Sequence, residues 1–175
     1  MINPDNNLAL FKVENSPIAG MGCFALASIA KGETVYRMTG EPADFETLLA
    51  LVLQGKEAPS DPLQIDIGSY LDLEEVSRSF NHSCNPNLFL RGTTELVALR
   101  DINVGEEMTY DYSTTMHYDL EQLQANKQES WTCTCCCGAD NCRGIIDEFK
   151  SLPEARKTYY LENSFVPDYI LRLFA

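Results

Sequence analysis

The sequence predicts a mainly β fold, in which short strands build several small sheets and the few helices are short. Segments with alternating or β-prone apolar residues recur between glycine-, asparagine- and proline-containing turns along most of the chain. Helical spacing of apolar residues is confined to residues 43–54 and to the part that follows residue 151. A chain of 175 residues can bury one good core, so two independent domains are not expected.

The N-terminal part predicts two strands. Residues 8–13 alternate enough for an opening strand, which leads into a turn containing Gly20 and Gly22. Glycines at this spacing permit a tight turn and a close approach of the backbone to another group, although a simple strand connection shows the same pattern. Residues 34–38 are β-prone and predict the next strand.

Residues 43–67 contain two patterns of apolar residues, one helical and one strand-like. Residues 63–67 alternate and predict a half-buried strand, whereas residues 43–54 have the spacing of a helix with one apolar face. Asp44 is a candidate N-cap of this helix and Gly55 its stop signal. The apolar face consists of Phe45, Leu48, Leu49 and Val52.

The second half predicts a hairpin, one more strand and a helical tail. Residues 88–90 and 95–99 flank a Gly-Thr-Thr turn and predict the hairpin, and residues 107–112 predict the strand. Residues 118–130 are polar and are expected to be partly helical.

The tail is expected to contain two helices. Ser151 and Glu154 have the spacing of a capping box and predict a helix that ends near Glu162. Pro167 then begins a last short helix with apolar residues on one side.

The net charge of −13 limits the possible partners. Nucleic-acid backbones and anionic lipids both select Lys and Arg, so direct binding to either is not expected, and a basic partner or substrate fits better. From Glu41 to Glu75 the chain carries nine acidic residues against the single Lys56. Such a run usually forms a solvated face; alternatively it lines a groove for a basic peptide.

Nothing in the sequence predicts a membrane segment. No run approaches the roughly 18 apolar residues that a spanning helix needs, and the N-terminus lacks the basic start and apolar core of a signal peptide. We therefore expect an intracellular protein. The sequence leaves open a cytoplasmic or a nuclear location, a role as a secreted effector, and the oligomeric state.

A cysteine cluster is the firmest local signal for a site. Seven cysteines, an odd number, do not suit a disulfide framework, and they favour a reducing compartment. A structural zinc needs four tetrahedral ligands and readily takes thiolates. The spacing Cys135-x-Cys137-x4-Cys142 supplies three, and Cys84 is a distant cysteine in a polar turn that supplies the fourth. Alternatively, Cys133 or Cys136 replaces one of these ligands.

Two tyrosines and a histidine are further candidates. On a strand, Tyr110 and Tyr112 would face the same side and Asp111 the other. Taken alone, paired tyrosines on a strand are more often core residues than catalytic ones, and His82 taken alone is more often a hydrogen-bonded turn residue than a base. No nucleophile elbow of the Gly-x-Ser-x-Gly type is present.

Three motifs taken together, and in this order, resemble the SET-domain lysine methyltransferases. They are Asn-His-Ser-Cys-Asn-Pro-Asn at residues 81–87, Gly-Glu-Glu-Met-Thr-Tyr-Asp-Tyr at 105–112, and Cys-x-Cys-Gly-x3-Cys-Arg-Gly at 135–144. The glycine turn near residue 20 and the Gly-Glu at 40–41 also look like that family. The resemblance covers about residues 8–146.

The resemblance implies a fold and a domain organisation. It implies a SET fold with a C-terminal pseudoknot, an exception to the usual unthreaded chain. Residues 8–113 would form the SET domain with a helical insertion at about 42–75. Residues 131–146 would form a post-SET zinc-binding segment, and 147–175 a short helical C-terminal tail.

The resemblance also implies cofactors and site residues. The cofactor would be S-adenosylmethionine, and a structural zinc would bind Cys84, Cys135, Cys137 and Cys142. Tyr112 matches the active-site tyrosine, and Tyr110 matches the position at which Phe or Tyr tunes the number of methyl groups. The cofactor-binding residues would be Met21, Gly22, Asn81 and His82, with Arg78 at the border of the pocket.

The implied activity is methyl transfer to a lysine side chain in a basic protein such as a histone tail, with mono- or dimethylation favoured by the hydroxyl of Tyr110. Two departures from the family pattern bear on this. Met38 stands where the family commonly has Tyr in the lysine channel, and Glu74-Glu75 stand where it often has Gly-Asn.

Two alternatives belong to other classes. One is a zinc-stapled binding module for a basic partner that kept the fold and lost the activity. The other is a thiol-redox or Cys/His hydrolytic enzyme, based on residues 133–136 and His117.

Overall fold

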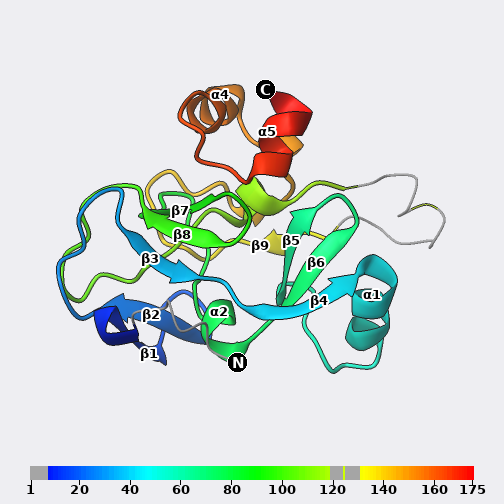
Figure 1. Ribbon diagram of the computed structural model, residues 1–175, viewed down its shortest axis with the longest axis horizontal. Helices are drawn as coiled ribbons and strands as arrows, with labels where there is room; N and C mark the ends of the chain where they lie inside the picture. Colours follow the sequence, from blue (N-terminus) through cyan, green and yellow to red (C-terminus); the bar gives the residue numbers. More distant parts are fainter. Residues whose placement is uncertain (1–7, 119–123, 125–130) are drawn as a thin grey trace.

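The computed structural model describes residues 8–118, 124 and 131–175, and within them short strands alternate with a few short helices (Figure 1). The elements in chain order are η1 Leu8–Leu10, β1 Phe11–Asn15, β2 Met21–Ala25, β3 Thr34–Arg37, β4 Gly40–Asp44, α1 Phe45–Leu53, β5 Pro62–Asp66, β6 Ser69–Leu73, α2 Glu75–Arg78, β7 Leu88–Arg91, β8 Glu95–Ala98, η2 Tyr112–Thr115, β9 Cys133–Thr134, β10 Ile145–Ile146, η3 Phe149–Ser151, α4 Glu154–Glu162 and α5 Asp168–Phe174.

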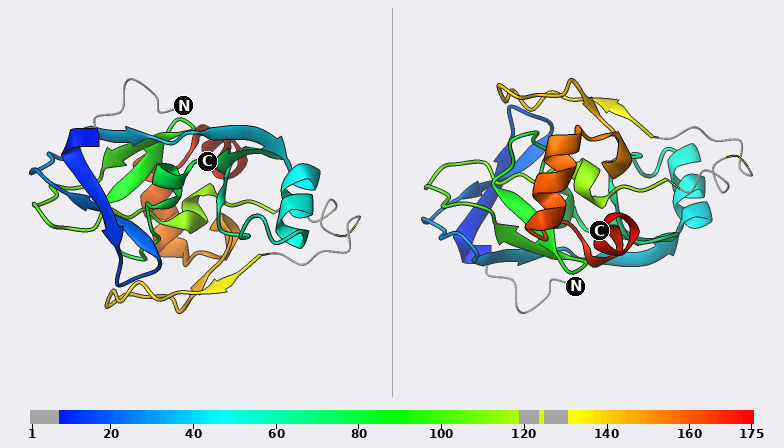
Figure 2. Two further views of the ribbon diagram at one scale, coloured as in Figure 1. Left: turned by 90° about the horizontal axis from the view of Figure 1, so that it is seen from below. Right: turned by 90° about the horizontal axis from the view of Figure 1, so that it is seen from above.

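The strands form small antiparallel sheets, as predicted. β1 pairs with β2, and β9 with β10. Two three-stranded sheets have the orders β3-β8-β7 and β4-β6-β5. The mainly β architecture with short helices is therefore confirmed. Figure 2 shows the β1–β2 sheet and α1 at opposite ends of the molecule.

One apolar core joins β1, β2, the β3-β8-β7 sheet and the segment before residue 81. Its centre is an aromatic group in which Phe11, Tyr36 and Phe80 stack edge-on or tilted, with ring centroids 5.2–5.8 Å apart. Met38 belongs to this core and is 3% exposed. The methionine at the position of the expected lysine-channel tyrosine therefore packs inside this core.

Most predicted strands of this core are confirmed. β3 matches residues 34–38, and β7 and β8 form the predicted hairpin, with Gly92 at a φ of +66° in its turn. The opening strand begins later than expected, because Leu8–Leu10 form a 3-10 turn before β1.

The insertion contains the predicted helix, but it holds more β structure than expected. Asp44 caps α1 by accepting a hydrogen bond from the Thr47 amide over 2.8 Å, and Gly55 follows the helix with a φ of +68°. The predicted strand at 63–67 is one member of the β4-β6-β5 sheet. β4, with the sequence Gly-Glu-Pro-Ala-Asp, is polar and largely exposed, so its hydrophobic pattern is too weak to have predicted a strand. β6, which pairs with both β4 and β5, was likewise not predicted.

Residues 107–112 do not form a strand, contrary to the prediction. Only isolated bridges join Glu107 to Phe24 and Tyr110 to His82, and Tyr112 already begins the 3-10 turn η2. The side chain of Asn87 accepts from the Thr109 amide and donates to the Glu107 carbonyl, both over 2.8 Å. Backbone bonds to Cys23, Asn81 and Ser83 hold the rest of the segment. The bridge between Tyr110 and His82 is parallel, which supports the predicted pseudoknot, although its threading stays a prediction.

The C-terminal tail contains the two predicted helices, α4 and α5, which pack around their own apolar cluster (Figure 1). The predicted capping box is wrong. Ser151 ends the 3-10 turn η3, and Pro153 precedes α4 without a side-chain cap. The segment 118–130, expected to be partly helical, lies almost wholly outside the described residues. Within those residues no helix has the length and apolarity to cross a membrane.

Candidate active site and metal site

Two cavities lie on either side of Tyr112. The larger, about 640 Å³, is bounded by the turn before β2, by α2 and by residues 131–137. The smaller, about 270 Å³, is bounded by α1, by the β5–β6 sheet and by the η2 turn. Tyr112 lines both, together with Ser60 and Trp131. A group bound in one cavity therefore meets a group bound in the other at this tyrosine.

Four of the five predicted cofactor residues line the larger cavity: Met21, Arg78, Asn81 and His82. Gly22 does not line it. A side chain there would place a Cβ 2.4 Å from Oε1 of Glu107, so the glycine is needed for the close approach of that carboxylate. The close approach predicted for this turn is thus present, but its partner is a residue of the protein.

Asn81 is the residue that fixes the wall of the larger cavity. It is 7% exposed, and its Nδ2 lies 3.1 and 2.9 Å from the carbonyl oxygens of Ala19 and Met21. The same nitrogen lies 2.8 Å from Oε1 of Glu107, which also accepts a bond from Ser16. Asn81 and Glu107 together therefore lock the glycine turn in place.

Arg78 holds the loop between α1 and β5. Its guanidinium lies 2.9 Å from Glu57, 3.5 Å from Asp61 and 2.7 Å from Asp72, and it also donates to the carbonyl of Leu73. Three acidic residues of the insertion, Glu57, Asp61 and Asp72, thus form ion pairs within the protein. Those that line a described cavity, Asp61 and Glu74-Glu75, belong to the larger one.

The smaller cavity has an apolar wall on the side of the insertion. Phe45, Leu48, Leu49 and Val52, the predicted apolar face of α1, all line it. Among the described residues that line this cavity none is acidic. The acidic run from Glu41 to Glu75 therefore does not form the wall that faces the two tyrosines.

Tyr110 and Tyr112 face the same side, as predicted, with ring centroids 4.7 Å apart. Tyr110 is 5% exposed and lines the smaller cavity only. The hydroxyl of Tyr112 donates to the carbonyl of Phe80 over 2.9 Å. Burial raises the pKa of both phenols above its ordinary value, so both are neutral near pH 7 and neither is a strong base.

His82 contacts both the Tyr112 backbone and the cysteine cluster. Its Nδ1 accepts a hydrogen bond from the Tyr112 amide over 3.1 Å, which leaves the proton on Nε2, 3.4 Å from the sulfur of Cys84. Burial lowers the pKa of His82 to about 4, although nearby Asp111 opposes the shift. The neutral ring thus orients the backbone at Tyr112.

Asp111 was not among the predicted site residues, yet it is the most connected side chain of this region. It is 1% exposed, and Arg143 donates to both of its oxygens, over 2.8 and 2.7 Å. Tyr160 of α4 adds a hydroxyl bond over 3.0 Å. The sequence alternation predicted that Asp111 faces away from the two tyrosines. It could not identify Arg143 and Tyr160 as the partners of Asp111, because both lie more than 30 residues away along the chain.

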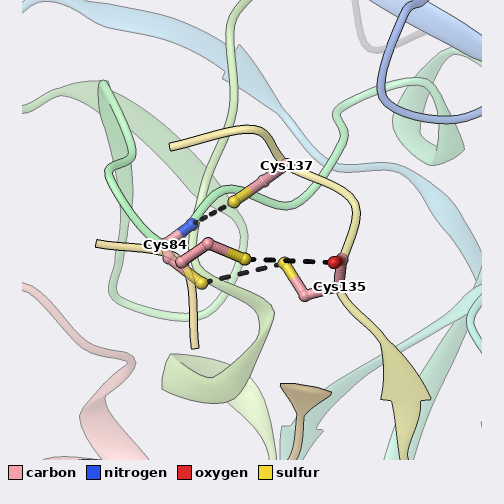
Figure 3. Close-up of side chains that lie close together, drawn as sticks. Cys84, Cys135 and Cys137 are labelled. Carbon is pink, nitrogen blue, oxygen red and sulfur yellow. Dashed lines mark hydrogen bonds between the residues drawn. The ribbon is translucent and has the colours of Figure 1, made fainter. Parts of the chain in front are cut away.

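The four predicted zinc ligands lie together. The sulfur atoms of Cys84, Cys135, Cys137 and Cys142 are all within 4.8 Å of one another. Ligands of a tetrahedral zinc at about 2.3 Å would be about 3.8 Å apart, and the sulfurs of Cys84 and Cys135 are separated by 3.7 Å. Figure 3 shows the side chains of Cys84, Cys135 and Cys137 converging on one point. The donor set therefore fits a structural zinc.

Backbone amides add to this fit. The amide of Cys84 points to the sulfur of Cys137, that of Arg143 to the sulfur of Cys84, and that of Gly144 to the sulfur of Cys142, over 3.4–3.5 Å. Burial opposes ionisation of Cys137, but hydrogen bonds from the amides of Cys84 and Ala139 and from the side chains of Cys135 and Cys142 together lower its pKa to about 7. Such N–H donors stabilise the thiolate that a metal requires.

The alternative ligands are placed elsewhere. Cys133 and Cys136 line the larger cavity and do not belong to the four-cysteine group. Cys23 is fully buried in the apolar core that contains β1 and β2. The contacts that the structure gives for the His117 ring are with Phe174 of α5 and with Glu148, whose Oε2 lies 3.8 Å from Nδ1.

The chain is similar to known proteins. The sequence model of the SET domain matches residues 20–113. Over 145 residues the chain is 30% identical to "Histone-lysine N-methyltransferase, H3 lysine-4 specific" of Saccharomyces cerevisiae, covering 75% of this chain and 13% of that protein. Over 156 residues it is 28% identical to "Histone-lysine N-methyltransferase set-2" of Caenorhabditis elegans, covering 79% and 9%. The chain therefore spans a small part of the curated relatives that it matches.

Two solved structures have a similar fold. The methyltransferase domain of human "Histone-lysine N-methyltransferase SETMAR" superposes with a TM-score of 0.59 at 25% identity, over 79% of this chain and 58% of that chain. KRYPTONITE in complex with mCHH DNA, an H3(1-15) peptide and SAH superposes with a TM-score of 0.57 at 24% identity, over 78% and 29%. These structures share the arrangement of small sheets found here.

Proposed function

The chain belongs to the SET domain family, and from this premise we propose that it transfers a methyl group from S-adenosylmethionine to the side-chain amine of a lysine in a basic protein or peptide. One observation carries the proposal: Tyr112 lines both cavities, so it lies where a cofactor in the larger one and a lysine in the smaller one would meet. The curated relatives, which are named histone-lysine N-methyltransferases, support the same activity.

The residues present fit the cofactor. Ile18, Ala19, Gly20 and Met21 offer backbone at one wall of the larger cavity, and Asn81 fixes that wall by its bonds to Ala19 and Met21. When bound, S-adenosylmethionine supplies an electrophilic methyl group on a sulfonium. No nucleophile of the protein is required for such a direct transfer.

The protein's task is then to deliver a neutral lysine amine in line with the methyl group. A free lysine has a pKa of about 10.4, and an apolar channel lowers it by desolvation. The aromatic rings of Tyr110 and Tyr112, with the apolar face of α1, provide such surroundings. The hydroxyl of Tyr112 donates to Phe80, so its oxygen is free to accept a bond from the amine. Most of the rate gain should come from this alignment.

The proposed products are mono- and dimethyl-lysine. Tyr110 is buried and its hydroxyl stays protonated, so it would hold a water in the channel and leave less room for a methylated amine. The replacement of the family's tyrosine by Met38 does not change the channel proposed for the lysine. Met38 is buried in the SET core and lines neither cavity.

The proposed zinc is structural. Cys84 lies two residues after His82, and Cys135, Cys137 and Cys142 lie on the loop that borders the larger cavity. Metal bound there would tie this loop to the cofactor wall. The metal has no part in the transfer itself.

We also propose the domain organisation expected from the resemblance: a SET domain at 8–113, a post-SET segment at 131–146 and a tail at 147–175. Three separate apolar clusters, in the SET core, around the cysteines and between the tail helices, support it.

The basic partner is a proposal that rests on the acidic net charge and on the H3 peptide present in one similar structure. That structure also contains DNA, so the expectation that this chain makes no direct contact with nucleic acid stays a prediction. The intracellular location stays a prediction too.

The test is a transfer assay with isotopically labelled S-adenosylmethionine, using histones and a whole-cell protein extract as substrates, with Tyr112→Phe as the matched control. We expect label on lysine side chains with the wild type and at least a tenfold lower rate with the variant. Cofactor binding in calorimetry without any transfer would favour the non-catalytic binding module. Absence of both binding and transfer would refute the proposal.

A further inference from the structure

The C-terminal tail is attached at three points to the segment that carries Tyr112. Tyr160 donates to Asp111 over 3.0 Å, Tyr169 donates to the carbonyl of Thr115 over 2.5 Å, and the amide of Phe149 donates to the carbonyl of Met116 over 2.9 Å. In the view from above in Figure 2 the yellow-green turn of this segment lies beside the orange helix α4. The tail thus holds residues 111–116, whose members Tyr112, Thr115 and Met116 line the smaller cavity.

The strongest of these attachments is the bond from Tyr160 to the buried carboxylate of Asp111. Asp111 and Tyr160 are each 1% exposed. Arg143 binds both oxygens of Asp111 from the cysteine loop, while Tyr160 reaches Oδ2 from α4. A bond between a buried hydroxyl and a carboxylate is charge-assisted and stronger than a neutral one. The carboxylate is therefore held from two separate elements.

The position of Tyr112 depends on that carboxylate. Tyr112 follows Asp111 directly, and Asp111 also accepts from the Ser113 amide over 3.2 Å, so the carboxylate sets the start of the η2 turn. The phenol of Tyr112 has one hydrogen-bond partner given by the structure, the Phe80 carbonyl. A rotation of the backbone at residues 111–112 would thus move the phenol along the wall between the cavities.

We propose that Tyr160 is a positioning residue for methyl transfer, which acts through Asp111 to hold Tyr112 at the wall shared by the two cavities. The inference rests on the proposed function. It gives the tail, which lies outside the matched residues 20–113, a role in the reaction. Alignment accounts for much of the rate in such reactions, and small displacements of a reacting group are costly.

The test compares two neighbouring tyrosines of α4 in the full chain. Tyr160→Phe removes one hydroxyl that bonds Asp111; Tyr159→Phe removes one from a side chain that is 40% exposed and lies next to it. With labelled cofactor and a methylatable peptide, Tyr160→Phe should lower kcat about tenfold, with KM and cofactor affinity within about twofold. Tyr159→Phe should match the wild type.

A merely structural role would give another pattern. It would lower the unfolding temperature of Tyr160→Phe but leave kcat per folded molecule, measured well below that temperature, unchanged, and this result would overturn the inference. If Tyr160→Phe does not fold, the same assay is carried out with Asp111→Asn, which keeps the shape of the side chain. An unchanged kcat in this variant also overturns the inference. A wild type without transfer activity refutes the proposed function itself, and the inference with it.

Discussion

Arg143 and Asp111 form a buried pair in which the guanidinium donates to both carboxylate oxygens, over 2.8 and 2.7 Å. The pair joins the cysteine loop to the segment between the two tyrosines. Asp111 has no exposed side-chain surface and Arg143 only 15%. The residue after the last cysteine thus connects the proposed metal site with the proposed catalytic site.

Breaking this pair should destabilise the fold. Arg143→Ala leaves the Asp111 carboxylate buried with Tyr160 and Ser113 as its remaining partners, and removal of one member of a buried ion pair typically costs about 3–5 kcal/mol. We expect a loss of about 3 kcal/mol in the free energy of unfolding, measured by urea denaturation. Arg91→Ala, at an exposed i,i+4 pair with Glu95, is the control and should change it by less than about 1 kcal/mol. Equal effects of the two variants would contradict the assignment.

The proposed zinc site predicts a loss of metal and cofactor affinity together. Cys84→Ser removes the ligand that lies beside Asn81 and His82, so zinc per chain, measured by atomic spectroscopy, should fall well below one. Cofactor affinity in calorimetry should fall in parallel, because the loop at 133–137 borders the larger cavity. Cys136→Ser, outside the four-cysteine group, should keep its zinc. Full zinc content in Cys84→Ser would mean that another cysteine is the ligand.

Tyr110 predicts the methylation state. Tyr110→Phe removes the hydroxyl proposed to hold a water in the channel, so the product should shift from mono- and dimethyl- to trimethyl-lysine. Mass spectrometry of a peptide substrate at long incubation times reads this directly. The first methyl transfer should stay within a few-fold of the wild-type rate. Dominant trimethylation by the wild type would show that Tyr110 does not limit the product.

Substitution of Gly22 should destabilise the protein by a steric clash. A Cβ at this position would lie 2.4 Å from Oε1 of Glu107 and 2.9 Å from Cβ of Ser16, so Gly22→Ala should cost about 1–3 kcal/mol of stability. Because Glu107 is the main obstacle, Glu107→Ala in the same chain should recover part of this loss, which a double-mutant cycle measures. Strict additivity of the two changes would show that they do not interact.

Glu106 predicts a pH dependence of stability. A side-chain hydrogen bond from Arg100 and bonds from Asn103 lower the pKa of Glu106 to about 2. A depressed carboxylate pKa stabilises the fold above the ordinary value of about 4.3, and this contribution is lost as the pH falls towards 2. Glu106→Gln should therefore cost about 1 kcal/mol at pH 7, a value reduced by solvent screening.

The measurement for Glu106 is the urea midpoint of the wild type and the variant between pH 7 and pH 3. The difference between the two should shrink as the pH decreases. A difference that grows in acid would contradict the assigned direction of the pKa shift.

Local patterns determined much of this protein. The hairpin at β7–β8, the helix α1 with its Asp44 cap and the two tail helices follow from periodicity and turn residues, and they are confirmed. The order of three motifs identified the family, and the spacing of three cysteines called for a fourth ligand from elsewhere in the chain. The helices, the hairpin and each motif could be predicted because each depends on residues close together in sequence.

The tertiary structure decided what depends on distant partners. Residues 107–112 make isolated bridges instead of a strand, and the Asn87 side chain takes two of their backbone bonds. Gly22 faces Glu107 rather than a cavity. The acidic insertion turns an apolar helix face towards the tyrosines, and Asp111 gains Arg143 and Tyr160 from two later elements. Sequence patterns report periodicity and local turns, whereas the partner of a buried polar group is set by which distant segments the packed core brings together.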